Sequence, residues 1–467
     1  MTVTHENLER LRKIPSVNEL LLLVQRAEWS ALYPQDHVVE SIRRVLETVR
    51  ARILESGVDV PTLEDLLGQV RIHLSDLAAF SLKRVVNATG IIVHTNLGRA
   101  PLSPEAVRHL AEIAGNYNNL EFDLARGVRG SREKHLEEIL SRLVPAEASL
   151  VVNNNAAALL LLLNTFAEGK EVLVSRGELV EIGGSFRLPD IMKKSQAVLR
   201  EVGTTNKTRL EDYRDAISDR TGLILVVHPS NFQIVGFTER PDAADLIALG
   251  ASRGIPVAED HGSGILTDLS GWGIPGEPCV ADRVRAGFDA VCFSGDKILG
   301  GPQAGIVCGR KEWIHRMRKN PLFRVLRVDK MVYAALEATL RLYFMERFDR
   351  IPVLKMLSVS GNDLKRAADN WQAELNPLLP GASLQVEQTV CYAGGGVAPM
   401  KGIDSCALSL KHPKLSAQEL AASLRKSEPP IVARIDEERV YFELRTLLEE
   451  DRSIITAALQ RIWSAQS

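Results

Sequence analysis

Aromatic residues, cysteines and long apolar runs are scarce in this sequence. Only 5% of its 467 residues are aromatic, which argues against a stacking surface along an extended single-stranded nucleic acid. The five cysteines form no CxxC pair and have no metal-ligand spacing, a pattern typical of buried thiols in a reducing compartment. The most apolar run, residues 156–163, is far shorter than the ~20 residues of a membrane-spanning helix. The first residues also lack the apolar segment of a secretory signal, so we expect a cytoplasmic protein.

A large net charge of either sign is also absent. Lysine and arginine number 57 and aspartate and glutamate 59, for a formal net charge of -2. This balance excludes a protein that coats nucleic acid with a uniformly basic surface, but it leaves room for a local basic patch. The length predicts roughly two to four domains, with enough core to fold without disulfides or a structural metal.

The apolar pattern divides the chain into three parts. Residues 1–80 show helical spacing and predict a helical N-terminal domain. Residues 81–350 alternate short β-branched runs with helical stretches, which predicts an α/β domain whose mostly parallel sheet is covered by helices. Residues 351–467 predict a small C-terminal α/β domain. The expected strands of the large domain are 172–175, 222–228, 256–260, 289–294 and 305–309, and those of the small domain are 383–388, 405–410, 430–434 and 439–444.

Lys297 lies in a glycine-rich loop between two of these strands, in the segment FSGDKILGGPQAG of residues 293–305. Glycines permit backbone conformations there that other residues resist. A lone loop lysine is usually a solvated surface residue. The small residues around this one, Ser294 among them, resemble the loop of fold-type-I pyridoxal phosphate enzymes, in which the lysine holds the cofactor as an internal aldimine.

The same cofactor needs a carboxylate that keeps its pyridinium nitrogen protonated. Asp260 ends the strand PVAED and stands 37 residues before Lys297, at the edge where an α/β sheet places its ligands. Strand alternation points one of the pair Asp260 and Glu259 away from the site, and we expect Asp260 to face the cofactor. A turn or helix-capping role is the common alternative for such an aspartate.

The cofactor phosphate needs backbone N–H groups at the start of a helix. A strand at 149–152, the three asparagines Asn153, Asn154 and Asn155, and a helix that opens with Ala156 meet this need. By itself, an ordinary capped turn is the better interpretation of this segment. The order of phosphate loop, carboxylate and lysine along one chain is far more specific than any single part, and it predicts a pyridoxal phosphate enzyme.

Longer motifs resemble one family in particular, bacterial selenocysteine synthase, the L-seryl-tRNA(Sec) selenium transferase. The similarity runs over essentially the whole chain, although the N-terminal and C-terminal parts match in pattern more than in residues. The motifs are NATGIIVHTNLGRAPL (87–102), GSR (130–132), VNNNAA (152–157), SRGELVEIGG (175–184), EVGTTN (201–206), residues 293–305 and RVLRVDK (324–330).

The resemblance implies that serine on tRNA(Sec) is converted to selenocysteine with selenophosphate. Lys297 would form the aldimine and remove the Cα proton, while Asp260 keeps the ring an electron sink. Loss of the serine hydroxyl would give an aminoacrylyl intermediate, to which selenium adds. The family is also characterised by a helical N-terminal domain that grips the tRNA and by dimers that assemble into a ring-shaped decamer.

Four arginines and one aspartate complete the implied site. Arg99, Arg324 and Arg327 match the family's substrate-binding arginines, and a guanidinium fork suits a phosphate-like anion. Arg324 and Arg327 share one face if their segment is helical, although a solvated basic patch is the plainer interpretation. Arg132 would serve the cofactor phosphate or the substrate. Asp296 would orient Lys297, pair with an arginine, or simply form a turn.

Two features fit the implied function less well. His228 and His261 stand at strand ends near the expected site, where a histidine would stack on or hydrogen-bond to the cofactor ring or be an ordinary polar residue. The family often has an apolar residue at the position of His261, so we leave His261 out of the catalytic set. Residues 1–80 carry nine lysines and arginines against twelve aspartates and glutamates, whereas a phosphate-binding domain ordinarily has a basic surplus. Arginines concentrated at 43–52 would make a local patch or an ordinary solvated helix face.

Two other functions remain open at this stage. One is a pyridoxal phosphate lyase that carries out β-elimination on a small amino acid without RNA. The other is a catalytically silent tRNA-binding scaffold, which the intact lysine, carboxylate and asparagine loop argue against.

Overall fold

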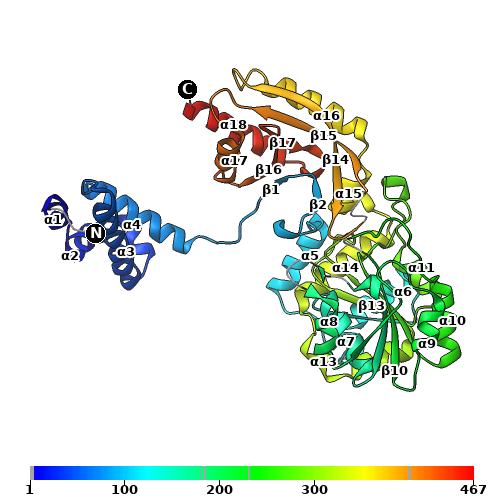
Figure 1. Cartoon of the computed structure of the whole chain (residues 1–467). Coiled ribbons are helices and arrows are strands. Elements are labelled where there is room, and N and C mark those ends of the chain that lie inside the picture. The colour runs from blue at the N-terminus through cyan, green and yellow to red at the C-terminus, as the bar shows by residue number, and fades with distance from the viewer. Residues whose placement is uncertain (1–4, 180, 183–185, 230–231, 398–400, 467) are drawn as a thin grey trace. The chain divides into compact units, whose positions relative to one another are not determined.

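The computed structural model describes residues 5–179, 181–182, 186–229, 232–397 and 401–466 (Figure 1). The chain divides into two compact units, Met1–Arg84 and Val85–Ser467. None of the helices within the described ranges is long and apolar enough to cross a membrane. All five cysteines are free thiols, and four of them are buried.

The first unit is built from helices. They are α1 (His5–Arg12), α2 (Val17–Gln25), α3 (Gln35–Ser56) and α4 (Leu63–Ala78), with a short 3-10 turn at Glu28–Leu32. The apolar stripe of α3, which includes Ile42, Leu46 and Ile53, is buried against α2 and α4. Such a stripe at helical spacing is what drives an amphipathic helix onto its neighbours. Capping boxes begin α2 and α4 and satisfy N–H groups that the helix itself leaves free.

The second unit contains a seven-stranded sheet in the order β5-β13-β12-β11-β10-β6-β9. β13 runs antiparallel to both of its neighbours, and the other pairs are parallel. Because β6, β9, β10, β11 and β12 all run in the same direction, their carboxyl ends meet at one edge. The strands are β5 (Ala148–Val152), β6 (Glu171–Ser175), β9 (Val198–Val202), β10 (Thr221–Val227), β11 (Val257–Gly262), β12 (Ala290–Ser294) and β13 (Gly305–Gly309).

Helices cover both faces of this sheet, as a largely parallel sheet requires. One face packs against α7 (Asn155–Ala167), α8 (Leu188–Lys194) and α12 (Lys311–Lys319). The other packs against α6 (Lys134–Leu143), α10 (Ala243–Arg253), α11 (Val280–Ala286) and α14 (Lys330–Phe344). On β11 the alternation sends Ala258 to the α7 face and Val257 to the α10 face. The same alternation places the next residues, Glu259 and Asp260, on the α10 face and the α7 face respectively.

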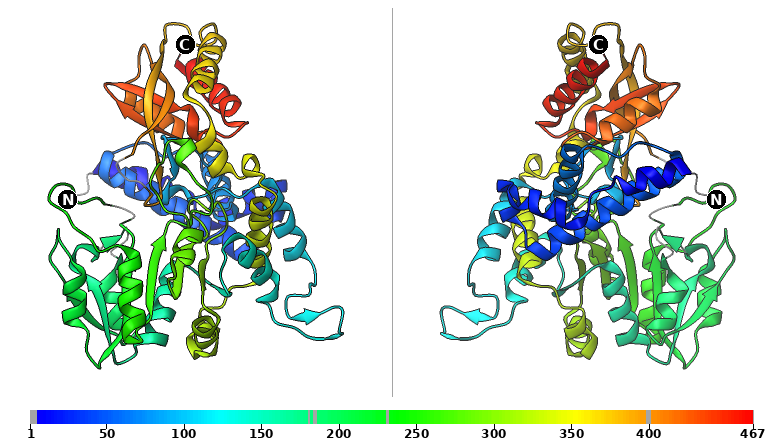
Figure 2. Two further views of the ribbon diagram at one scale, coloured as in Figure 1. Left: turned by 90° about the vertical axis from the view of Figure 1, so that its right-hand side faces the viewer. Right: turned by 90° about the vertical axis from the view of Figure 1, so that its left-hand side faces the viewer.

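A six-stranded sheet forms the core of the rest of the unit (Figure 2, orange and red). Its order is β1-β16-β17-β15-β14-β2. The strands are β1 (Val86–Ala88), β2 (Ile91–Val93), β14 (Ser383–Gly394), β15 (Ile403–Lys411), β16 (Ile431–Asp436) and β17 (Arg439–Glu443). α16 (Gly361–Leu375), α17 (Ala417–Arg425) and α18 (Asp451–Gln466) supply the apolar side chains that pack on it.

β1 and β2 precede the seven-stranded sheet in the chain, yet they pair with the C-terminal strands β16 and β14. The sequence division at residue 81 assigned them to the large domain, because three-residue strands carry too little periodicity to reveal their partner. Between the two sheets in sequence come α5 (Pro104–Gly115) and the hairpin of β3 (Phe122–Asp123) and β4 (Val128–Arg129). That hairpin projects from the body of the unit (Figure 2, cyan).

Candidate active site

Lys297 follows β12 in the loop that leads into β13. Ser294, the last residue of β12, is buried and pairs with Gly305, the first of β13. The lysine side chain is largely shielded from solvent, and burial lowers the pKa of its ammonium group. The negative charges of Asp260 and Asp296 oppose that shift, and the positive charge of Arg99 adds to it. A larger fraction of neutral amine is therefore present than on an exposed lysine.

Asp260 lies near the carboxyl end of β11, on the face that packs against α7. Asn155 Nδ2 donates a hydrogen bond to Asp260 Oδ1 at 2.7 Å. Burial raises the pKa of Asp260, while the bond from Asn155 and the positive charge of Lys297 favour the carboxylate. Glu259 points to the other face, where Arg283 Nε donates to Glu259 Oε2 at 2.6 Å. The structure therefore brings Asp260, and not Glu259, together with Lys297.

Gly262 leaves space between the amine and the carboxylate. A Cβ atom at this position would lie 3.9 Å from both Asp260 Oδ1 and Lys297 Nζ, and its backbone has a φ of +71°. A side chain here would enter the gap between the two charged groups, and the left-handed conformation itself favours glycine. The space between the shielded amine of Lys297 and the buried carboxylate of Asp260 therefore has room for the ring of a cofactor.

The start of α7 lies at the same edge of the sheet. Asn154 caps this helix, accepting a hydrogen bond from the N–H of Ala157 at 2.9 Å. Asn155 and Ala156 then open the helix, where backbone N–H groups lack partners within the helix itself. Asn153 is exposed, and its N–H donates to the Leu326 carbonyl at 3.1 Å. The sequence assigned all three asparagines to a phosphate, but the side chain of Asn155 binds Asp260 instead.

These groups fit pyridoxal phosphate by their chemistry. A shielded amine suits the aldehyde, a buried carboxylate suits the pyridinium nitrogen, and a helix start suits the phosphate. Asn155 Oδ1 is buried and has no hydrogen-bond partner in the described part of the chain. A buried acceptor of this kind is normally bonded, so a bound group at this edge would complete the site.

Arg99 lies beside the lysine loop. Its Nη1 donates to Asp296 Oδ2 at 2.6 Å, with the carboxylate mostly buried and the guanidinium one-third exposed. Gly98 and Arg99 both have positive φ, of 88° and 65°, so a tight turn after the 3-10 helix Thr95–Leu97 presents the side chain. A cavity of about 330 Å³ lies here. Its lining residues include Thr95, Gly98, Arg99, Asp296, Gly301 and Gln303.

Three arginines donate hydrogen bonds to the carboxylate of Glu121. Arg132 is buried and binds Glu121 Oε1 through Nε at 3.1 Å and through Nη2, while its Nη1 donates to the Val328 carbonyl at 2.7 Å. Arg327 Nη1 donates to the same Oε1 at 3.5 Å, and Arg129 binds Oε2. The hydrogen bond from Arg132 lowers the pKa of Glu121, despite an opposing effect of burial.

Arg324 and Arg327 do not share a helical face. α13 spans only Pro321–Val325, so Arg324 lies exposed in its last turn and Arg327 lies beyond its end. The backbone of Arg327 forms an isolated bridge with Val152 at the end of β5. The expected helix is broken because the chain is drawn into this bridge, and Arg327 thereby comes to the edge of the sheet where α7 begins.

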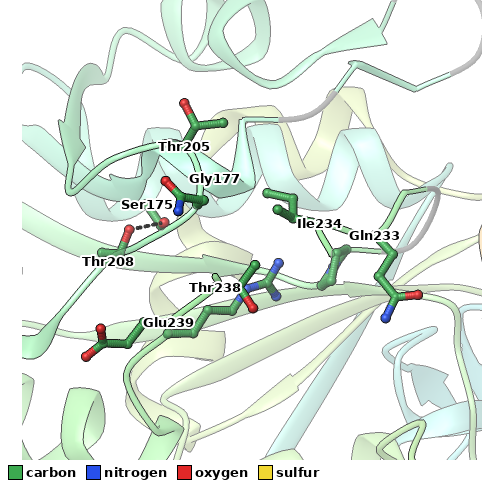
Figure 3. Close-up of a pocket in the computed structure, with 11 residues that line it drawn as sticks. Ser175, Gly177, Thr205, Thr208, Gln233, Ile234, Thr238 and Glu239 are labelled. Atoms are coloured by element: carbon green, nitrogen blue, oxygen red, sulfur yellow. Dashed lines mark hydrogen bonds between the residues drawn. The ribbon is translucent and has the colours of Figure 1, made fainter. Parts of the chain in front are cut away.

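A second hollow lies further along the carboxyl edge, at the ends of β6 and β9 (Figure 3). Its volume is about 370 Å³. Ser175 Oγ and Thr208 Oγ1 lie 2.8 Å apart in its wall, and Glu239 and Arg240 also line it. Sequence reasoning missed this hollow, because hydroxyl side chains scattered over three segments give no local motif. It also missed Glu121 and Gly262, whose roles depend on the distant residues Arg327 and Lys297.

Comparisons with known proteins agree with this geometry. The family model of L-seryl-tRNA selenium transferase matches residues 85–448, and the selenocysteine synthase N-terminal model matches residues 11–50. The L-seryl-tRNA(Sec) selenium transferase of Carboxydothermus hydrogenoformans is 46% identical over 443 residues, covering 94% of this chain and 95% of that protein. The enzyme of the same name from Aquifex aeolicus is 46% identical over 455 residues, covering 97% and 99%.

Solved structures match at lower identity. D-glucosaminate-6-phosphate ammonia-lyase has a TM-score of 0.57 at 21% identity, covering 87% of this chain and 99% of that chain; this likeness shows the fold alone. The expected fold class, a fold-type-I α/β enzyme, is confirmed. From the matched length and the identity to its relatives, this chain belongs to the L-seryl-tRNA selenium transferase family.

Proposed function

We propose that this enzyme converts L-seryl-tRNA(Sec) to L-selenocysteinyl-tRNA(Sec), replacing the serine β-hydroxyl with selenium from selenophosphate. The observation that carries the proposal is the meeting of Lys297, Asp260 and the start of α7 at one sheet edge, in a chain of this family. Pyridoxal 5'-phosphate is the cofactor, and it supplies an electron sink for the charge left at the serine Cα.

Lys297 and Asp260 are the catalytic residues of this proposal. Lys297 would hold the cofactor through its aldehyde carbon, and its amine is the group that would accept the proton from the serine Cα. Its lowered pKa suits that role, because a neutral amine accepts a proton and an ammonium does not. Asp260 would keep the ring nitrogen protonated, and the hydrogen bond from Asn155 orients Asp260 and favours its ionised form.

The remaining cofactor contacts follow from the start of α7. Asn154, Asn155 and Ala156 would hold the phosphate through backbone N–H groups, beside Asn153, whose own N–H is bonded to the Leu326 carbonyl, and Ser294 would close the lysine side of the site. Gly305 is needed for this arrangement, because a Cβ atom there would collide with the backbone of Asn154. β13 therefore passes directly beneath the helix start.

The arginines bind the anionic selenium donor. Arg99 is held by Asp296 next to the lysine loop, where Asp296 fixes the direction of the guanidinium. Arg327 stands at the end of β5, steadied by Glu121 together with the buried Arg132. Arg324 is exposed one turn away and is free to swing toward an anion. A guanidinium fork bound on one side by a carboxylate still offers donors on the other.

Residues 1–80 bind the tRNA in this proposal, residues 81–350 form the cofactor-binding domain and residues 351–467 the small domain. Four arginines of α3 support the RNA contact, because all of them are exposed although the unit as a whole is acidic. We name them the α3 arginines: Arg43, Arg44, Arg50 and Arg52. Exposed guanidinium groups along one helix can bind phosphates without a basic surplus in the whole domain.

The chain also acts as an oligomer, a ring of dimers of decameric size, in this proposal. The supporting observation is a group of large apolar side chains on and before the β3–β4 hairpin, Tyr117, Phe122 and Leu124, that are exposed in the single chain. Patches of this kind usually mark contact surfaces. Light scattering of the purified protein measures the assembly directly.

The cytoplasm is the compartment that follows from a tRNA substrate.

The test is selenocysteinyl-tRNA(Sec) formation from purified seryl-tRNA(Sec), selenophosphate and enzyme. We expect turnover by the natural chain, loss of turnover and of bound cofactor absorbance in Lys297→Ala, and retention of both in Lys170→Ala, a control at the amino end of β6. Turnover of free serine without any selenocysteinyl-tRNA would support the lyase instead. A colourless protein that binds tRNA would support the scaffold.

A further inference from the structure

A cluster of metal-binding side chains lies behind the candidate active site, on the face of β11 turned away from α7. His228, Glu259 and His261 each offer one ligand atom, and these atoms all lie within 4.8 Å of one another. Glu259 and His261 flank Asp260 in sequence and point to the opposite face. His228 follows β10, and its backbone N–H donates to the Asp260 carbonyl at 2.9 Å, which sets it beside them.

The His261 imidazole has an unmet bonding capacity. The residue is 0% exposed, and neither Nδ1 nor Nε2 has a hydrogen-bond partner within the described ranges. The Pro278 carbonyl lies near the ring but outside hydrogen-bonding geometry. Glu259 Oε1 is likewise buried and unbonded. Buried polar atoms are nearly always bonded, so three such atoms next to one another indicate that a ligand completes this place.

Neighbouring side chains orient these ligand atoms through hydrogen bonds, as the residues around the ligands do in known metal sites. Arg283 binds Glu259 Oε2 at 2.6 Å and leaves Oε1 free. Glu277 Oε2 lies 3.0 Å from His228 Nε2. When Nε2 donates its proton there, Nδ1 keeps the lone pair that binds a metal, and carboxylate–histidine pairs are the usual support of a ligating imidazole.

Space and charge are also compatible with an ion. A cavity of about 110 Å³ is lined by His228 and Glu259 and has room for a water molecule. Two arginines, Arg240 and Arg283, line the same cavity. Glu178 and Glu259 line the cavity with them, Glu277 contacts His228 Nε2, and His261 lies outside the lining.

We propose that His228, Glu259 and His261 bind one divalent ion of the Zn²⁺ class, with a water molecule as the fourth ligand. Two imidazoles and one carboxylate suit Zn²⁺ and its neighbours in the transition series, whereas Mg²⁺ and Ca²⁺ prefer oxygen ligands throughout. The ion ties the end of β11 to the residue after β10. It thereby holds the backbone on both sides of Asp260 without taking part in the reaction.

The experiment measures metal in untagged holoenzyme, because a histidine tag would itself bind zinc. Elemental analysis after extensive dialysis is expected to find about one Zn²⁺ per chain. Co²⁺ added to the metal-free protein is expected to give the visible d–d bands of a four-coordinate site. Absence of a stoichiometric ion together with absence of Co²⁺ bands would overturn the proposal and assign the place to ordered water.

Variants separate the cluster from adventitious binding. His261→Leu and His228→Asn are each expected to weaken Co²⁺ binding by at least tenfold. His412→Asn is the matched control, since His412 is another buried histidine with an unbonded ring nitrogen, and it is expected to bind Co²⁺ like the natural chain. If His261→Leu fails to fold, His228→Asn decides, because the His228 side chain is 17% exposed. Equal binding by His228→Asn and the natural chain would refute the assignment.

Discussion

Replacing Asn155 with alanine tests how the active-site carboxylate is held. The bond from Asn155 Nδ2 to Asp260 Oδ1 measures 2.7 Å and is partly buried. A hydrogen bond to a charged group contributes about 1.5–3 kcal/mol. Its loss would raise the pKa of Asp260 further, because the bond favours the ionised form. If all of that free energy reaches the contact with the pyridinium nitrogen, cofactor binding weakens by about 10- to 150-fold.

The assay is titration of cofactor-free Asn155→Ala with pyridoxal phosphate, followed by absorbance at several pH values. Asn164→Ala is the matched control, because Asn164 lies on the same helix and its side chain binds Asn320 and the Ser195 carbonyl, away from the site. We expect the weakening in Asn155→Ala alone, and a larger weakening at low pH, where more Asp260 is protonated. A change below about twofold in Asn155→Ala, or equal losses in both variants, would refute the reasoning.

Three further predictions concern the groups around this centre. Cofactor attachment needs the neutral amine of Lys297, so the attachment rate should rise with pH as the ammonium loses its proton. Asp296→Asn removes a charge that raises the lysine pKa and should move this rise to lower pH, whereas Arg99→Gln should move it to higher pH. Shifts in the same direction for both variants would contradict the charge argument. Arg327→Ala should lower selenium transfer at least tenfold while changing cofactor affinity less than twofold, as measured by turnover and absorbance titration; equal losses would make Arg327 structural. Alanine at each α3 arginine that contacts phosphate should lower the salt dependence of tRNA binding by roughly one unit of log–log slope, and an unchanged slope would place the RNA elsewhere.

Much of the sheet was predictable because its strands are apolar on both faces and short enough to stand out between helices. The segment 305–309 is a strand from Gly305 to Gly309, and the other expected strands of the large sheet differ by one or two residues at their ends. Alternation along β11 also separated Asp260 from Glu259, since that argument needs only the period of two in a strand.

The sequence could not reveal which residues far apart in the chain contact each other in the fold. The amide of Asn155 meets Asp260 across 105 residues, and no local pattern distinguishes that role from binding phosphate. The helix expected to carry Arg324 and Arg327 stops at Val325, because the bridge between Arg327 and Val152 competes with a further helical turn. Such competition is settled by tertiary contacts and not by local propensity.

The pairing of β2 with β14 has a mechanical consequence for the site. Lys297 and Asp260 are anchored in the seven-stranded sheet, whereas Arg99 comes six residues after β2, which belongs to the other sheet. The bond between Arg99 and Asp296 therefore links the segment that follows the six-stranded sheet to the lysine loop of the seven-stranded sheet. A substitution that shifts β2 within the six-stranded sheet would therefore also displace the guanidinium beside the reacting lysine.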